Sequence, residues 1–397
     1  MGRGMGGRAM ALLGVIALYW MSLYLYVPVF GPDMVRNGSG YGWVGLAVAA
    51  YGLPQLTLRA WLGIWADGSG HLKPFLAVAL GMAAVSSAVM GAFPLAWVFV
   101  LGRLLAGVAA SFWAMFSTLY VNEYGAGGAR PALGWVSFAN SGGQVLAALL
   151  GGWMAQLWGW QVPFWAAAVT AGVGLALLAA VHERGRRGSG EGEAAPKAVS
   201  LLRATPSLRL AAGLGIFSQV ATFVLPFGFL PVWAYHLGFS RSALGVLTMV
   251  GQIPATLVNL LAAGRWVSRW PLERVSLAGL VLALVACAAM PWVRAPWGLL
   301  ALQAVFGAGR GILSPTLMAM AIQEVAARVR TTAMAVYQAS YALGMVGGPL
   351  LAGWAVGRFG LGSAFAIAGG ALALGVGMAL RRPKPASSAA PEARPRP

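Results

Sequence analysis

The sequence predicts an all-α membrane protein of about twelve transmembrane helices, arranged as two pseudo-symmetric six-helix bundles. Three observations support this prediction: the composition, the number of long apolar runs and an internal repeat. Hydrophobic residues make up 59% of the 397 residues and charged residues only 9%. In soluble domains roughly a quarter of all residues are charged. An ordinary core cannot bury so much apolar surface, so most of it must face lipid.

The apolar runs give the number of spans. A helix needs roughly 20 apolar residues to cross the hydrocarbon core. Runs of that size lie at about residues 9–30, 42–64, 75–93, 95–119, 131–155, 163–181, 210–233, 243–264, 275–291, 296–318, 331–354 and 358–380.

The distribution of Lys and Arg predicts the orientation, because cytoplasmic loops are enriched in these residues. With a cytoplasmic N-terminus and twelve spans, 20 of the 27 Lys and Arg residues fall in cytoplasmic segments and four in outside loops. We therefore expect a prokaryotic plasma (inner) membrane protein with both termini in the cytoplasm. The same placement explains the net charge of +18 without nucleic acid as a partner.

One long polar interruption divides the chain. Residues 182–209 are rich in Gly, Ser, Glu and Arg, a composition typical of a flexible linker. The predicted organisation is an N-terminal bundle at 1–181, a cytoplasmic linker at 182–209, a C-terminal bundle at 210–382 and a disordered cytoplasmic tail at 383–397.

An internal repeat supports two equivalent halves. An offset of about 200 residues aligns Pro54 with Pro254, Glu123 with Glu324 and Gly152-Trp153 with Gly353-Trp354. The first span of each half also carries late prolines, at Pro28 and Pro32 and at Pro226 and Pro231.

Polar residues within the spans predict a central pathway. Spans 3, 6, 9 and 12 have no charged residue, Asn or Gln in their interiors, so we expect them to lie outside the other eight. The predicted pathway residues are Tyr19, Trp20, Tyr24, Gln55, Arg103, Asn140, Gln144, Gln219, Gln252, Asn259, Gln303, Arg310, Tyr337, Gln338 and Tyr341. Alternatively, the amides bond across packed helices and the aromatic rings of span 1 pack in the core. Arg59 follows Tyr51 and Gln55 at helical spacing, but its place near the end of its span favours a side chain that extends to the interface.

Three motifs resemble those of the major facilitator superfamily. The loop after span 2 reads Gly63-Ile64-Trp65-Ala66-Asp67-Gly68-Ser69-Gly70-His71-Leu72-Lys73, and span 4 contains Gly102-Arg103-Leu104-Leu105-Ala106-Gly107. Span 11 contains a Gly-rich Gly-Pro run, Gly344 to Gly353, which is similar to the antiporter motif. The resemblance implies alternating access and assigns gating roles to Gly63, Asp67, Gly70, Lys73, Gly107, Gly344, Gly348 and Pro349. For the glycines, close helix packing is the alternative.

The resulting functional hypothesis is a secondary transporter, acting as a monomer in the lipid bilayer, that exports a small amphipathic molecule. The resemblance to drug exporters implies proton antiport, although no carboxylate lies near the centre of any span. The alternative is an organic-anion carrier, by exchange or facilitated diffusion, that uses Arg103 and Arg310. A receptor without transport stays open, whereas the chain has no pattern typical of an enzyme. We expect no cofactor and no metal site.

Overall fold

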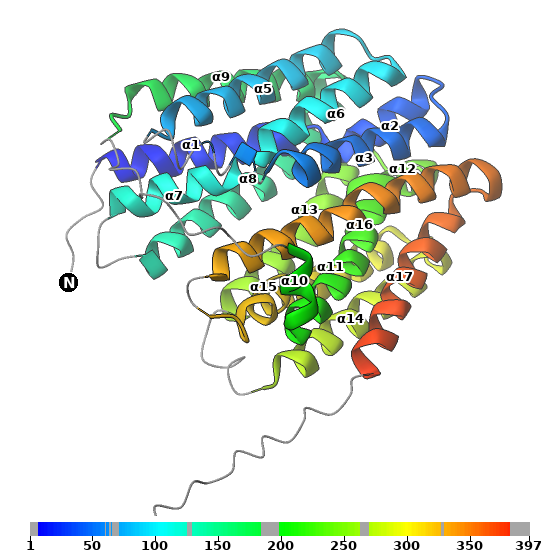
Figure 1. The fold of residues 1–397 in the computed structure, drawn as a ribbon. Helices are drawn as coiled ribbons and strands as arrows, with labels where there is room; N and C mark the ends of the chain where they lie inside the picture. The colour runs from blue at the N-terminus through cyan, green and yellow to red at the C-terminus, as the bar shows by residue number, and fades with distance from the viewer. Residues whose placement is uncertain are drawn as a thin grey trace, which may run out of the picture.

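The structure is a computed structural model that describes residues 7–59, 61–62, 65, 71–124, 129–183, 198–262, 270–326 and 329–381. These residues form helices joined by short loops, and no strand occurs among them. Figure 1 shows the N-terminal helices, blue to green, lying beside the C-terminal helices, green to red. The predicted two-bundle, twelve-helix fold class is confirmed.

The N-terminal bundle contains six membrane-crossing units, two of them broken near the middle. The first unit pairs α1 with α2, and the fourth pairs α6 with α7. Pro28 in the first turn of α2 lacks the N–H group that an unbroken helix would use. The helices are α1 (Gly7–Tyr24), α2 (Val27–Arg36), α3 (Tyr41–Thr57), α5 (Lys73–Ala92), α6 (Ala96–Ser111), α7 (Trp113–Tyr124), α8 (Ala129–Trp158) and α9 (Val162–Ala180).

The C-terminal bundle repeats this order. Its first unit is broken by a π-helical turn, Leu225–Phe229, which contains Pro226. Pro28 and Pro226 thus fall at the breaks of the two first spans, whereas Pro32 and Pro231 lie within the helices α2 and α12 that follow. The helices are α11 (Pro206–Val224), α12 (Leu230–His236), α13 (Arg241–Ala262), α14 (Leu272–Ala289), α15 (Pro296–Ile322), α16 (Arg330–Phe359) and α17 (Gly362–Leu380).

Part of the predicted linker is helical. Residues Ala198–Ala204 form α10, and α11 already begins at Pro206. The prediction of a flexible loop is therefore wrong for most of residues 198–209. Proline suits the first helical turn because no intrahelical acceptor is lost there, and the Glu324 carboxylate accepts a hydrogen bond from the Ser207 backbone N–H at 3.1 Å. Residues 184–197 and the predicted tail at 383–397 lie outside the described residues.

The helices without interior polar residues lie at the periphery, as predicted. In each bundle two of them pack together, α5 with α9 and α14 with α17. The two bundles meet along two seams, α3 against α16 and α8 against α13. Among the described helices, nine are long and apolar enough to cross a membrane. The helices α3, α8 and α13 are not among these, and they carry several of the predicted polar pathway residues.

Both seams are tightest at one end of the molecule. We call the end where α5 begins and α9 ends the linker end, and the opposite end, with the turns at 37–40 and 237–240, the far end. Toward the far end, Gly152 of α8 faces Gly245 of α13 so closely that a Cβ on Gly152 would lie 2.6 Å from the Gly245 Cα. In the seam between α3 and α16, a Cβ on Gly45 would lie 2.7 Å from the Gly353 Cα. The backbones of the two bundles therefore touch at the far end.

Candidate functional site

A cavity of about 340 Å³ lies between the two bundles. Its walls come from α1, α3, α7 and α8 of one half and from α11, α13, α15, α16 and the π-helical turn of the other. The peripheral helices α5, α9, α14 and α17 contribute no described residue. The cavity is thus surrounded by the eight spans that the polar pattern singled out.

Most of the predicted pathway residues line this cavity. They come from both halves and mix aromatic rings, amides and one arginine: Trp20, Tyr24, Gln55, Asn140, Gln144, Gln219, Gln252, Arg310, Tyr337, Gln338 and Tyr341. The backbone of Asn259 belongs to α13, but its side chain lies outside the described residues.

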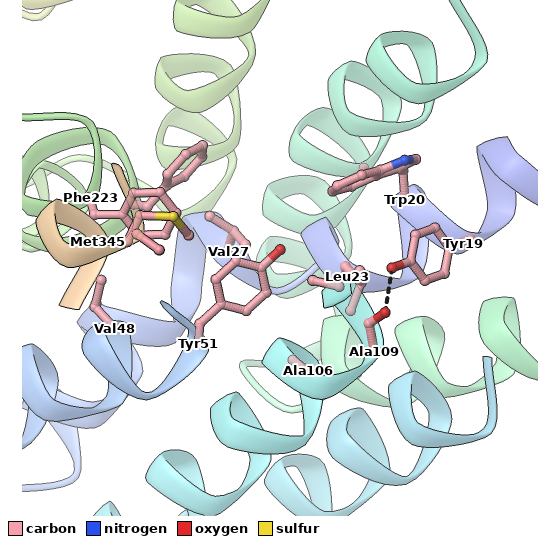
Figure 2. Packing of buried hydrophobic residues seen from close by; sticks show 14 of the residues in the cluster. Tyr19, Trp20, Leu23, Val27, Val48, Tyr51, Ala106, Ala109, Phe223 and Met345 are labelled. Carbon is pink, nitrogen blue, oxygen red and sulfur yellow. Dashed lines mark hydrogen bonds between the residues drawn. The ribbon is translucent and has the colours of Figure 1, made fainter. Parts of the chain in front are cut away.

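Tyr19 and Gln303 do not line the cavity. The Tyr19 hydroxyl donates to the Ala109 carbonyl of α6 at 2.8 Å (Figure 2). Its ring stacks on Phe116 with centroids 4.3 Å apart. Gln303 is buried, and its amide lies against Gly251 of α13, where a Cβ would meet the amide nitrogen at 2.4 Å. Both side chains pack between helices of one bundle.

Arg103 also lies away from the cavity. Its side chain is buried, and the guanidinium lies 4.3 Å from the Tyr51 ring centroid and 5.3 Å from that of Phe30. Tyr51 lines the cavity and Arg103 lies behind it. The predicted pairing of Arg103 with Arg310 in one site is therefore wrong, because this face of α6 turns toward the aromatic rings of its own bundle.

Arg59 is the second arginine of the cavity. It lies two residues beyond the end of α3. It donates to the side-chain oxygen of Gln55 at 2.8 Å and, across the seam, to Gln338 at 3.1 Å and the Tyr341 hydroxyl at 3.2 Å. Sequence reasoning set Arg59 aside because of its place near the end of the span. Its helical spacing with Tyr51 and Gln55 could have indicated that Arg59 faces the cavity.

A chain of side-chain hydrogen bonds crosses the other seam. Arg310 of α15 donates to Gln252 of α13. The Gln252 amide nitrogen donates to Gln144 of α8 at 2.6 Å, and the Gln144 amide nitrogen donates to Asn140 at 2.5 Å. Each glutamine amide accepts from one neighbour and donates to the next, so the chain begins at a cation and runs from one bundle into the other.

Aromatic side chains form one wall of the cavity. Trp20 contacts Trp113 at 5.0 Å and Tyr24 at 5.8 Å between ring centroids, and Tyr24 contacts Phe227 at 5.6 Å. Trp113 and Phe227 were not predicted, because an apolar residue in a membrane span carries no signal of which way it faces. Ser218 and Thr222 also line the cavity, and their helical spacing with Gln219 was the missed sign of a polar face on α11.

The cavity carries positive charge without acidic residues. Arg59 and Arg310 line it, whereas no Asp or Glu occurs among its described lining residues. The ion pair between Arg36 and Asp33, at 3.0 Å, and the contact between His71 and Glu183, at 3.7 Å, lie elsewhere.

The predicted gating residues that the structure describes lie at helix contacts. Lys73 donates to the carbonyls of Ala179 and Val181 at the end of α9. A Cβ at Gly107 would lie 2.4 Å from the Tyr51 carbonyl oxygen, and one at Gly344 2.2 Å from that of Ile216. Gly348 packs on Val220, and the Pro349 carbonyl lies against Gly45. Gly63, Asp67 and Gly70 lie outside the described residues, so their gating role stays a prediction.

The sequence is similar to one known protein family and to several of its characterised relatives. The family model described as Major Facilitator Superfamily matches residues 12–240 and 212–397. The chain is 26% identical over 366 residues to the class G tetracycline resistance protein of Vibrio anguillarum, covering 87% of this chain and 89% of that protein. It is 27% identical to the multidrug resistance protein MdtG of Dickeya zeae, covering 82% and 80%.

Solved structures show the same fold. The nucleoside transporter NupG superposes with a TM-score of 0.76 at 16% identity, covering 94% of this chain and 98% of that chain. A D-xylose-proton symporter superposes with a TM-score of 0.73 at 17% identity, covering 94% and 97%.

Proposed function

Because the chain belongs to the Major Facilitator Superfamily, whose members are transporters rather than enzymes, we propose that it exports small amphipathic organic molecules by alternating access. It is a multi-pass membrane protein. The proposal places it in the inner membrane of a prokaryote with both termini in the cytoplasm. Each chain holds its own cavity, so a monomer suffices.

The observation that carries this proposal is the cavity lined by both bundles. Rocking of two halves around a site near the midplane exposes such a site to each side in turn. The backbone contacts at Gly45–Gly353 and Gly152–Gly245 close the far end, so we assign this structure to a state closed on that side.

The direction and the substrate class rest on separate observations. Relatives named for tetracycline and multidrug resistance align over most of the chain, which supports export. Aromatic rings beside amide groups suit a molecule with one apolar and one polar part. The described cavity lining holds no carboxylate that could exchange a proton, so no coupling ion is assigned to the transport.

Uptake into inside-out membrane vesicles tests the proposed function. Vesicles containing the protein should accumulate compounds from a labelled panel of amphipathic molecules and metabolites faster than vesicles without it. Ser218→Trp should abolish this uptake, because Ser218 lines the cavity and an indole would fill part of it. Ser363→Trp, in the first turn of α17, is the matched control and should transport normally. Equal uptake with and without the protein across the whole panel would contradict the proposal.

A further inference from the structure

The charge of the cavity bears on the chemical class of its substrate. A cation in a membrane span costs several kcal/mol unless water, a partner or a ligand meets it. The described cavity lining holds two arginines and no acidic residue. We propose that the substrate is an amphipathic organic anion whose carboxylate binds Arg310. This inference rests on the proposed function and specifies the substrate of that same cavity.

Arg310 has hydrogen-bonding capacity to spare. A guanidinium carries five N–H donors, and Arg310 donates one side-chain bond, from Nη2 to the Gln252 side-chain oxygen. Its other N–H groups have no hydrogen-bond acceptor among the described residues. Because two of these groups lie parallel on one edge of the planar group, they can bind both oxygens of a carboxylate.

Arg59 differs from Arg310 in this respect. Its two terminal nitrogens donate to Gln55, Gln338, Tyr341 and the Ala110 carbonyl. A carboxylate at Arg59 would have to displace these bonds, two of which, to Gln338 and Tyr341, join the two bundles. Arg59 therefore adds positive potential to the cavity, whereas Arg310 offers the binding edge.

The surroundings of Arg310 fit an aromatic or other apolar body attached to the carboxylate. The guanidinium carbon lies 5.4 Å from the Phe227 ring centroid, and Phe227 contacts Tyr24, which contacts Trp20. This row of rings starts at the cation and continues along the cavity wall. A cavity of about 340 Å³ lies at the small end of the range for ligand sites, which suits a molecule of one or two rings.

Binding of three matched probes to the purified protein tests the anion. The probes are 2-naphthoate, 2-naphthamide and 2-naphthylmethylamine, which share one ring system and differ in charge. Dissociation constants can be measured by tryptophan fluorescence or calorimetry in detergent at fixed salt. We expect the carboxylate to bind about ten- to a hundredfold more tightly than the amide, the range of a charge-assisted hydrogen-bond pair.

Variants locate the anion within the cavity. Arg310→Gln should remove the preference for carboxylate over amide, and Arg310→Lys should keep only a small part of it, because an ammonium cannot reproduce the two-pronged geometry. The ratio of the two constants is the readout, so a general loss of stability does not mimic the result. Arg358→Gln, at the exposed end of α16, should preserve the full ratio.

Several results would overturn the inference. These are amide or amine binding as tightly as carboxylate, no binding of any probe, or a preference that survives Arg310→Gln but disappears in Arg59→Gln. Vesicle uptake of the amide or the amine without uptake of the carboxylate would refute the anion while leaving the transporter function intact.

Discussion

Gly344 and Gly347 lie about one turn apart on α16 but have different surroundings. A Cβ at Gly344 would lie 2.2 Å from the Ile216 carbonyl oxygen of α11, whereas a Cβ at Gly347 would meet no atom within 4 Å. Only the first position therefore needs glycine. Both belong to the run that resembles the antiporter motif, so contact with α11 separates residues that the motif groups together.

Alanine at the two positions should have unequal effects. We expect Gly344→Ala to destabilise the protein by about 1–3 kcal/mol, because α16 would have to move away from α11. Gly347→Ala should be neutral or slightly stabilising, since alanine favours a helix more than glycine does. Thermal unfolding of the purified variants in detergent, followed by tryptophan fluorescence, would measure the difference. Equal midpoints would contradict the packing described for α16.

The residues that sequence reasoning misplaced share one physical cause. Helical spacing fixes which residues of one helix share a face, but it does not fix how that helix is rotated within the bundle. Tyr19 and Trp20 are neighbours in α1, yet the first bonds to α6 and the second lines the cavity. Arg103 was misplaced for the same reason, because the rotation of α6 turns its side chain toward the Tyr51 and Phe30 rings rather than into the cavity.

At the scale of helices, the sequence predicted more of the structure than it did for single residues. Each apolar run falls on a helix, or on two helices in succession, of the described chain, because lipid favours long apolar segments where the chain crosses. The absence of interior polar residues identified α5, α9, α14 and α17 as peripheral. The helical residues 198–204 were missed, because a short helix packed by its neighbours leaves no mark in a composition rich in Gly, Ser and charged residues.

The seam between α8 and α13 should control access from the far end. Gly152→Val would place a side chain where the Gly245 backbone now lies, so we expect the far end to be wedged open and transport to slow. A Cys287→Ala, Ser218→Cys background reports this opening, because a membrane-impermeant maleimide added from the far end should then reach the cavity faster.

Gly142→Val provides the matched control on the same helix. A Cβ at Gly142 would meet no atom within 4 Å, so the labelling rate should stay at that of the parent protein. If Gly152→Val and Gly142→Val label at the same rate, the glycine contact does not close the far end.

For the molecule as a whole, the charge distribution and the fold make a joint prediction about topology. Twelve spans place residues 37 and 381 on opposite sides of the membrane, and the excess of Lys and Arg places the latter in the cytoplasm. In a Cys287→Ala background, Asn37→Cys should react with an impermeant maleimide on intact cells. Arg381→Cys should react only after lysis. Both side chains are exposed, so accessibility within the protein does not confound the comparison, and labelling of Arg381→Cys on intact cells would reverse the proposed orientation.

The lack of a carboxylate among the described cavity residues also concerns the energy source of transport. A bacterial membrane is electrically negative inside, and moving one unit charge across it changes the free energy by about 2.3 kcal/mol per 100 mV. A neutral or cationic drug gains nothing from that voltage on leaving the cell. An organic anion held by Arg310 is driven outward by the voltage, and at about 100 mV its concentration could reach roughly fiftyfold outside over inside. If the substrate is an organic anion, the membrane potential alone would power its export, and a proton-binding carboxylate in the cavity would be unnecessary.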